Sequence, residues 1–348
     1  MSQQTYVISK ADLNEHYEAI LELWKRNRVP YPERRYAWIY TRPPGACSKG
    51  WLATTSSGDV VGFAGLLFRK MRIGDRHVEV GQAVDLVVDP PHRAFGPMLD
   101  LQRELIRSVQ LQSIPFVYAF PDRRLEKLFR RIGYQYLGEM QRWTKPFRVE
   151  DWVVKYVPSP VGAKLSGRFI DVLLKWSTKE RTYTKPTWGK FEDVCQFDER
   201  FDDLYRRGGG RYTVVGDRSA ASLRWRFGHS EPVGCRMLAL SNSSGRLHGY
   251  IIFSCQQSVT RIIDVFAEPW DCLDALLGEL IIRMRREKMS AINCNYMGSE
   301  WLSSLLSAWG FYLRPVGARM LVFPNDNVLA SCFLDRGRLF VTDGDRDV

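Results

Sequence analysis

Two short patterns occur twice in this chain, and the two copies of each are separated by nearly the same distance. The pattern Asp-x-x-x-acid-Pro begins at Asp85 and begins again at Asp264, which lies 179 residues later. A glycine followed by an aromatic residue occurs at Gly133 and again at Gly310, which lies 177 residues later. Two matches at nearly one offset, in the same order, predict that the second half of the chain repeats the arrangement of the first.

The first half contains alternating signals for helices and strands. Asp12 and Glu15 have the spacing of a helix capping box, and apolar residues follow at helical intervals as far as Trp24. Turn residues then separate hydrophobic runs, which favours an antiparallel meander. The elements predicted after the first helix are strands at 51–55, 60–71 and 78–88, a helix at 97–110, a strand at 116–120, a helix at 123–131 and a strand at 134–143.

The second half gives the same order of signals. Its predicted elements are helices at 198–206 and 220–227, strands at 236–241, 249–255 and 259–266, a helix at 271–286, a strand at 291–295, a helix at 300–309 and a strand at 311–322. A chain of 348 residues also exceeds the usual size of a single hydrophobic core. We therefore expect an α/β (α+β) protein with two tandem domains, each a mixed, mostly antiparallel sheet flanked by helices.

The domain boundaries follow from the repeat and from a change of composition near residue 145. We predict an N-terminal domain at 1–145, a basic linker at 146–194, a second domain at 195–325 and a C-terminal tail at 326–348. The linker contains an amphipathic segment between Leu165 and Trp176. Such a segment either docks on its own protein or makes a weak contact with a membrane surface.

Composition excludes several classes of protein. Lysine and arginine exceed aspartate and glutamate by 50 to 39, a charge of +11 that suits an anionic cofactor, but no nucleic-acid motif accompanies it. Nucleic acid is therefore an unlikely partner. The seven cysteines and five histidines show no metal-ligand spacing, so we expect no metal. No transmembrane segment and no apolar signal region is present, which predicts a cytoplasmic protein.

One loop in the first half has features that predict an anion-binding site. The strand that ends at Val88 runs into a Pro- and Gly-containing turn, and a helix begins directly after Gly96. A helix N-terminus offers unpaired N–H groups and a favourable dipole, and Arg93 adds a side chain that matches phosphate geometry. The second copy lacks this loop, so we expect one anion site, in the first half.

Two segments of the first half resemble motifs of the GNAT (Gcn5-related N-acetyltransferase) family. Residues 88–98, VDPPHRAFGPM, are similar to the family's acyl-CoA loop, V-x-P-x-y-R-x-x-G-x-G/A. Residues 128–134, LFRRIGY, are similar to its later L-Y-x-x-x-G-F segment. The order of elements agrees over about residues 5–143 and more faintly over 195–323. The resemblance implies acetyl-CoA or another acyl-CoA as acyl donor.

The resemblance also implies where the donor would bind. Its pyrophosphate would lie on the backbone amides of residues 94–98, and its pantetheine arm would pair with the strand at 86–88. The cofactor-binding residues expected on this basis are Leu86, Val87, Val88, Arg93, Ala94, Phe95, Gly96, Pro97, Met98 and Asp122. The chain departs from the family pattern at three places, namely Pro97, Met98 and Phe129, the last of which replaces a tyrosine that protonates the departing thiolate. Tyr134, Tyr118 or water would have to take that role, and we name Tyr134 as the catalytic candidate.

Asp85 is the candidate base. Transfer of an acyl group to an amine requires the ammonium to lose a proton, which a carboxylate near the thioester accepts directly or through water. Asp85 interrupts an otherwise apolar strand, so its charge needs a reason. The alternative is a structural role, and Asp264 at the matching position of a copy without the loop favours that alternative.

Two classes of function remain open from the sequence. The first is a CoA-dependent N-acyltransferase that acts on the amine of a small metabolite, amino sugar or amino acid by direct attack in a cleft; a variant uses acyl carrier protein as donor. The second is a non-catalytic binding or scaffold protein that keeps the fold. Arg218, Arg224, Trp225 and Arg226 in the second half fit either an anionic substrate or a structural helix.

Overall fold

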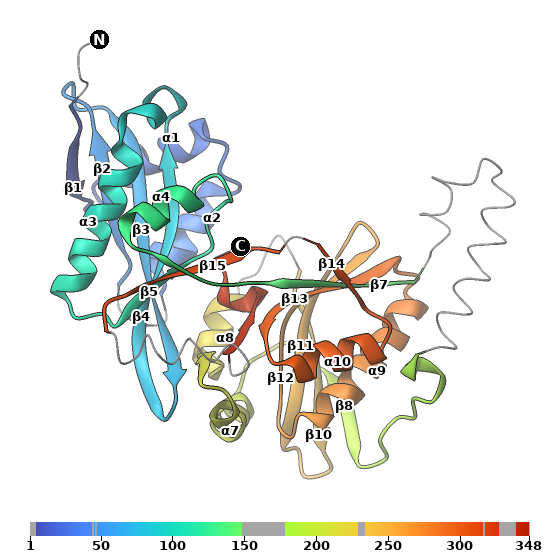
Figure 1. The fold of residues 1–348 in the computed structure, drawn as a ribbon. Coiled ribbons are helices and arrows are strands. Elements are labelled where there is room, and N and C mark those ends of the chain that lie inside the picture. Colours follow the sequence, from blue (N-terminus) through green and yellow to red (C-terminus); the bar gives the residue numbers. More distant parts are fainter. Residues whose placement is uncertain are drawn as a thin grey trace, which may run out of the picture.

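The fold is described from a computed structural model. It describes residues 5–43, 45, 47–147, 178–228, 234–315, 317–326 and 339–347, without the side chains of Ala94 and Phe95. The predicted amphipathic segment at 165–176 lies outside these residues. Two lobes stand side by side, and strands of both lobes form one connected sheet (Figure 1).

The first lobe contains the predicted meander. Strands β2 (Lys49–Thr54), β3 (Val60–Ile73) and β4 (Arg76–Val88) are antiparallel, and β1 (Val7–Lys10) pairs with β2. Helix α3 (Pro97–Leu111) then returns the chain to β5 (Phe116–Ala119), which is parallel to β4. The turns fall where the sequence places Ser-Ser-Gly-Asp and Gly-Asp, so these elements are confirmed.

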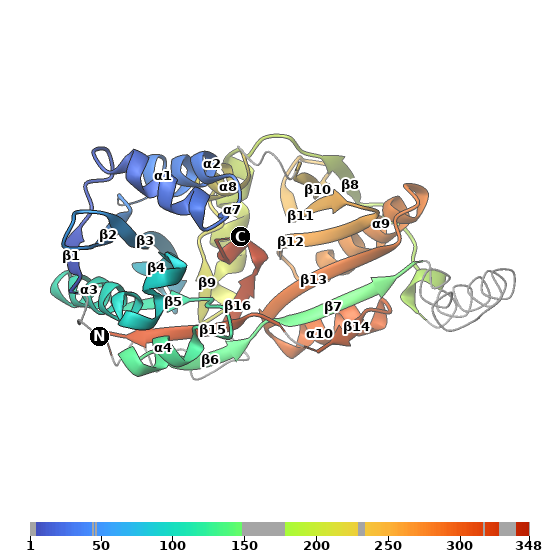
Figure 2. The ribbon, with the colours of Figure 1, turned by 90° about the horizontal axis from the view of Figure 1, so that it is seen from above.

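Helices cover both faces of the first sheet, as the alternation of side chains along its strands requires. On one face, Phe63 and Leu67 of β3 pack with α1 (Tyr17–Arg26), α2 (Pro32–Tyr36) and the π-helical turn η1 (Ala37–Thr41). On the other face, Leu66 and Phe68 pack with α3 and α4 (Glu126–Ile132). The two groups of helices lie on opposite sides of the strands in Figure 2.

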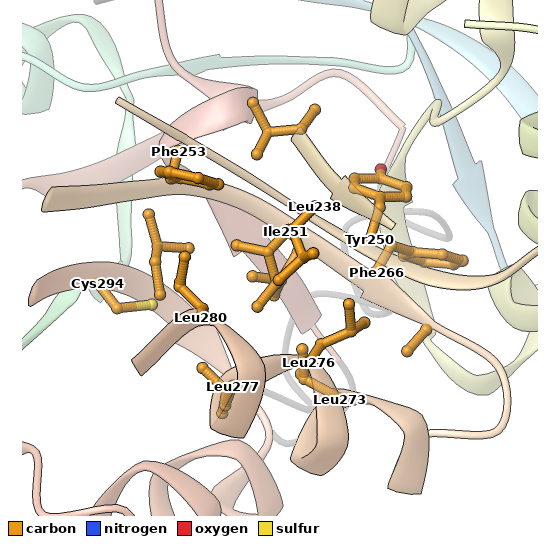
Figure 3. Close-up of a cluster of buried hydrophobic side chains, with 14 of the residues drawn as sticks. Leu238, Tyr250, Ile251, Phe253, Phe266, Leu273, Leu276, Leu277, Leu280 and Cys294 are labelled. Atoms are coloured by element: carbon orange, nitrogen blue, oxygen red, sulfur yellow. The ribbon is translucent and has the colours of Figure 1, made fainter. Parts of the chain in front are cut away.

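The second lobe repeats this order. Strands β10 (Arg236–Asn242), β11 (Leu247–Gln256) and β12 (Val259–Ala267) form a meander, and α9 (Asp271–Arg286) leads to β13 (Ala291–Gly298), which is parallel to β12. Strand β8 (Gly189–Asp193) extends the edge, and α10 (Glu300–Ala308) precedes β14 (Tyr312–Arg314). Leu273, Leu276, Leu277 and Leu280 of α9 face the sheet in the core of this lobe (Figure 3).

The two helices before this meander are also observed. Helix α7 (Glu199–Gly208) begins at Asp198, whose carboxylate accepts a hydrogen bond from the Arg200 N–H, and a short turn η4 (Gly209–Arg211) follows it. Helix α8 (Ala220–Phe227) is capped by Ser219. Both begin at residues whose side chains replace the missing helical acceptors, as capping predicts.

Each half of the chain contributes one of its strands to the sheet of the other lobe. The predicted strand 134–143 is in fact two strands, β6 (Gln135–Glu139) and β7 (Gln141–Pro146), and β7 lies between β13 and β14 in the second lobe. The predicted strand 311–322 is likewise broken, because β15 (Arg319–Pro324) lies between β5 and β6 in the first lobe. The two segments of the chain cross where the Met140 N–H donates to the Ala318 carbonyl. They lie so close there that a Cβ at Gly317 would overlap the Met140 carbonyl.

The end of the chain is also part of the sheet. Strand β16 (Leu339–Thr342) is antiparallel to β13 and parallel to β9 (Val214–Gly216), which pairs with β3 of the first lobe. A short 3-10 turn, η6 (Asp343–Asp345), follows β16. Residues 339–347 therefore do not form the tail that the sequence analysis expects, because the apolar Leu339, Phe340 and Val341 are buried between the lobes.

Candidate active site

A cleft of about 1200 Å³ lies between the two lobes. The first lobe contributes α2, η1, β4, the end of β5 and α4, and the second lobe contributes α8 and residues of β11, β12 and β13. Asp343 and Asp347 of the C-terminal segment also line it. Clefts between lobes are a common place for ligand sites, and this one is large enough for an extended molecule.

Strands β4 and β5 separate at the wall of the cleft. They are paired at Gly81–Val117 and Gln82–Tyr118, and no later pair joins them among the described residues. Beyond this point Leu86 of β4 lines the cleft, as do Ala119 and Asp122 on the side of β5. The outer edge of β4 is therefore open to a ligand backbone over the segment where the sequence predicts the pantetheine arm.

Asp85 lies at a bulge in this open part of β4. Its φ of +53° is unusual for a residue with a side chain, and the pairing register with β3 shifts between Phe63 and Gly65. The bulge turns the carboxylate toward Arg35 Nε at 2.5 Å and the Tyr40 hydroxyl at 2.7 Å. Gly65 leaves the space for that hydroxyl, because a Cβ there would overlap it. Burial raises the pKa of Asp85, although the positive charge of Arg35 opposes the shift.

Arg35 joins Asp85 to the C-terminal segment. Its Nη2 lies 2.6 Å from the Asp347 carboxylate, and its Nη1 donates to the Asp347 carbonyl at 2.6 Å. The Asp347 side chain is 20% exposed, whereas that of Asp85 is 3% exposed, so Asp347 is the more accessible carboxylate. Sequence reasoning missed Asp347, since it placed this residue in a tail; the cluster of aspartates at 343–347 was the available signal.

The place in the second lobe that corresponds to the Asp85 site is filled by the C-terminal segment of the chain. Asp264 accepts hydrogen bonds from Arg218 Nη2 at 3.0 Å and from the Tyr250 hydroxyl at 2.8 Å. The Thr342 hydroxyl donates to the same carboxylate at 2.6 Å, and Gly344 lies directly against it. Strands β12 and β13 also separate after Ile262 and Cys294, but β16 pairs with β13 from Tyr296 onward. The opening that remains free in the first lobe is filled in the second.

The predicted phosphate loop is present before α3. Residues Pro90–Phe95 form a 3-10 turn, η2, and Gly96 has a φ of +96°, a conformation that suits glycine. Arg93 folds back along the loop, where its Nε donates to the Val88 carbonyl at 2.9 Å and its Nη2 to Asn27 Oδ1 at 3.0 Å. The N–H groups of Leu99 and Asp100 both bond to the Gly96 carbonyl, so the turn forms the cap of α3. Arg93 braces this loop against the end of β4.

The structure brings some of the predicted site residues together and not others. Asp85, Leu86 and Asp122 line the cleft, and Val87 and Val88 follow on the same strand. Arg93, Gly96, Pro97 and Met98 do not line it; they belong to the turn and to the start of the helix whose Gln102 does. Phe129, which the sequence resemblance aligns with a tyrosine of the GNAT family, lines the cleft.

Tyr134, the tyrosine named as a catalytic candidate, does not line the cleft. It is buried between the rings of Phe129 and Phe323, and burial raises the pKa of its hydroxyl. Tyr118 is also buried, and its hydroxyl donates to Gln82 Oε1 at 2.9 Å. Neither hydroxyl lines the cleft, because Tyr134 packs against Phe323 of β15, which comes from the second half of the chain, and the Tyr118 hydroxyl lies 3.2 Å from the Asp345 carbonyl.

The arginine-rich segment at α8 has one arginine in a buried ion pair and another that lines the cleft. Arg218, just before it, is buried in ion pairs with Asp264 and Asp345, which favours the structural alternative for this residue. The Trp225 ring stacks on Trp38 of the first lobe at 5.3 Å, and its Nε1 donates to the Trp38 carbonyl at 3.1 Å. Arg226 lies over the other face of Trp38 at 4.6 Å, and it lines the cleft.

Gln102 of α3 is a cleft residue that sequence reasoning missed. It falls on the apolar face of the helix beside Leu101 and Leu105, and a glutamine on that face is the signal that could have found it. Among the described residues, no group of three or more His, Cys, Asp or Glu side chains is placed to hold a metal ion. No described helix combines the length and apolarity needed to cross a bilayer.

Comparison with solved structures finds close matches of fold at low sequence identity, whereas no family model and no curated sequence matches. A "Probable N-Acyltransferase" from Enterococcus faecalis has a TM-score of 0.68 and 14% identity, over 95% of this chain and 75% of that one. A GCN5-related N-acetyltransferase from Anabaena variabilis has a TM-score of 0.65 and 15% identity, over 94% and 74%. The Saccharomyces cerevisiae N-myristoyltransferase with bound myristoyl-CoA has a TM-score of 0.57 and 12% identity, over 93% and 79%.

Proposed function

Since this chain has the GNAT fold that its sequence predicts, we propose that it is an acyl-CoA-dependent N-acyltransferase. It would move an acetyl or another acyl group from CoA to the amine of a small molecule. The observation that carries the proposal is the opening between β4 and β5, which lies in the wall of the cleft between the lobes, on the strand that precedes the predicted phosphate loop. Two of the similar proteins are described as N-acyl- or N-acetyltransferases, and a third binds myristoyl-CoA, which supports a thioester donor.

The donor would lie across the first lobe. Its phosphates would sit at the N-terminus of α3, where the helix dipole and the backbone N–H groups of residues 94–96 and 98 favour negative charge, since Pro97 has no N–H. Arg93 would add its guanidinium, of which Nη1 takes no part in the bonds to Val88 and Asn27. The pantetheine arm would extend along the open edge of β4 at Leu86–Val88, with Asp122 on the facing wall of the opening. This direction would bring the thioester close to Asp85.

The chemistry would be a direct transfer. The neutral amine attacks the thioester carbonyl, a C–N bond forms, the C–S bond breaks, and CoA leaves as a thiolate. The proton released by the amine goes to Asp85, directly or through water. Two hydrogen bonds occupy the Asp85 carboxylate, which has about four lone-pair sites, so it can still accept a proton. Water would protonate the thiolate, which is a good leaving group because its pKa is about 8.5.

The acceptor would bind on the side of the second lobe. There the cleft is lined by the neutral polar side chains Ser254, Gln256, Gln257 and Asn293 and by the charged Arg226, Arg261 and Asp343, while Trp38 lines it from the first lobe. These groups suit a small, polar amine such as an amino sugar or an amino acid, because they offer several neutral hydrogen bonds and an aromatic surface.

Two measurements test this proposal. Calorimetry with CoA should give one site per chain, and thiol release from acetyl-CoA and longer acyl-CoAs should appear when a panel of amino sugars and amino acids is added. If the protein binds no CoA but transfers an acyl group from acyl carrier protein, then that carrier protein, and not CoA, is the donor. Absence of both activities would support the non-catalytic alternative.

A further inference from the structure

Gln102 is a buried polar side chain without a partner. It is fully buried in the middle of α3, and neither its carboxamide oxygen nor its carboxamide nitrogen has a hydrogen-bond partner among the described residues. A buried amide without hydrogen bonds costs folding free energy, so native proteins rarely keep one. Its buried neighbours on α3, Leu101 and Leu105, pack on the sheet as ordinary core residues. Packing alone therefore does not account for a glutamine here.

The place of Gln102 in the cleft points to a ligand. It lines the part of the cleft that lies between α3, α4 and the separated strands β4 and β5. Leu86, Ala119, Leu125 and Phe129 line the same part and are apolar. A ligand that fills this space therefore meets mostly apolar side chains, together with the carboxylate of Asp122 and the carboxamide of Gln102. The carboxamide offers one acceptor and two donors.

We propose that Gln102 hydrogen-bonds an amide of the pantetheine arm of the acyl donor; this inference rests on the proposed function. The arm contains secondary amides, and each has one N–H donor and one carbonyl acceptor; the carboxamide can accept from such an N–H through its oxygen or donate to such a carbonyl through its nitrogen. An apolar acyl chain in this place would leave Gln102 without partners. The phosphates of the donor carry negative charge, which a neutral carboxamide between apolar side chains would hold poorly.

The chain would then recognise the arm from two sides. The open edge of β4 offers backbone groups at Leu86–Val88, and α3 offers Gln102 from the other wall of the opening. Gln102 would thus be a specificity-determining residue for donors with the pantetheine arm. A ligand with the nucleotide end of CoA but no arm would gain nothing from it.

The test compares two ligands on wild-type protein and on Gln102→Met, which keeps the length of the side chain and removes its polar groups. Calorimetry is done with CoA and with adenosine 3′,5′-bisphosphate, which keeps the adenosine, the 3′-phosphate and one 5′-phosphate of CoA but has no arm. We expect the Kd for CoA to rise about tenfold, or ~1.4 kcal/mol, and the Kd for the bisphosphate to stay unchanged. We also expect the melting temperature of the ligand-free variant to stay equal or rise, because an unpaired buried amide is removed.

Each other outcome has a definite meaning. An unchanged Kd for CoA in Gln102→Met, or an equal loss for both ligands, overturns the inference and leaves the proposed function standing. Wild-type protein that binds neither ligand overturns the proposed function together with the inference. If Gln102→Met unfolds, Gln102→Leu replaces it: this side chain also has no polar group, so CoA affinity should fall while bisphosphate affinity does not. Equal effects on the two ligands would again overturn the inference.

Discussion

Asp85 and Asp264 lie 179 residues apart in the sequence, and both accept hydrogen bonds from one tyrosine and one arginine. Each carboxylate accepts a hydrogen bond from a tyrosine hydroxyl, at 2.7 Å from Tyr40 and 2.8 Å from Tyr250. Each also pairs with a buried or half-buried arginine, Arg35 or Arg218, which holds a second aspartate of the C-terminal segment. The difference between the lobes is access, because Asp85 lines the open cleft while Thr342 and Gly344 cover Asp264.

This relationship provides a matched pair of variants. We expect Asp85→Asn to reduce acyl-transfer turnover by about 10²–10⁴-fold while leaving CoA affinity nearly unchanged, since it removes the proposed proton acceptor. Asp264→Asn should lower the urea midpoint of unfolding without changing turnover per folded molecule. Steady-state kinetics and urea unfolding of both variants check this. An Asp85→Asn protein with full turnover would mean that the amine loses its proton to another group.

The phosphate loop gives a second prediction. Arg93→Ala should weaken CoA binding by about 1–3 kcal/mol, the range of charge-assisted hydrogen bonds, because the variant loses both the cation and the brace at the end of β4. Titration calorimetry measures the change. Arg107→Ala is the control, since Arg107 is a largely exposed residue farther along α3. Equal Kd values for wild type and Arg93→Ala would place the phosphates elsewhere.

The exchanged strands give a third prediction. A fragment of residues 1–147 should not unfold cooperatively, because β6 pairs with β15, which the fragment lacks. A fragment in which a short flexible linker joins residue 139 to residues 317–326 should recover cooperative unfolding, since it restores β15 between β5 and β6. Circular dichroism during urea titration distinguishes the two. A cooperative unfolding transition in the first fragment would show that the first lobe is stable without β15.

The buried ion pair of Asp345 and Arg218 gives a fourth prediction, which concerns pH. Burial by itself would raise the pKa of Asp345, but the charge and hydrogen bonds of Arg218 hold it below the ordinary value of 3.8. The stability from this pair is therefore complete above pH 3.8 and is lost as the pH falls through the lower folded-state pKa.

Asp345→Asn should accordingly destabilise the protein by about 3–5 kcal/mol at neutral pH, since it leaves Arg218 buried with one partner fewer. The difference from wild type should persist at pH 5 and shrink below pH 3.8. Urea unfolding at several pH values measures it, with the exposed Asp100→Asn as control. A difference that disappears by pH 5 would contradict the assignment.

The sequence by itself determined the elements of this protein and their order. Hydrophobic alternation and turn residues predict the meander of β2, β3 and β4, and the predicted helix at 271–286 coincides with α9. The repeat at Asp85 and Asp264 predicts that the two halves share one plan, and the GNAT resemblance predicts the fold. These features are local, because the period of a strand or helix and the geometry of a turn depend on neighbours along the chain.

The tertiary structure alone decided which strands pair and which side chains face the cleft. Nothing near Met140 or Gly317 predicts that the chain crosses into the other lobe there, because a strand edge accepts any partner that the remaining packing brings to it. The same crossing buries Tyr134, and the C-terminal segment brings Asp347 to Arg35. The sequence does not distinguish Gln102 from other glutamines, because its burial without a hydrogen-bond partner at the cleft depends on the packing of α3. Pairing and burial are long-range properties, since they depend on contacts between residues that are distant in the sequence.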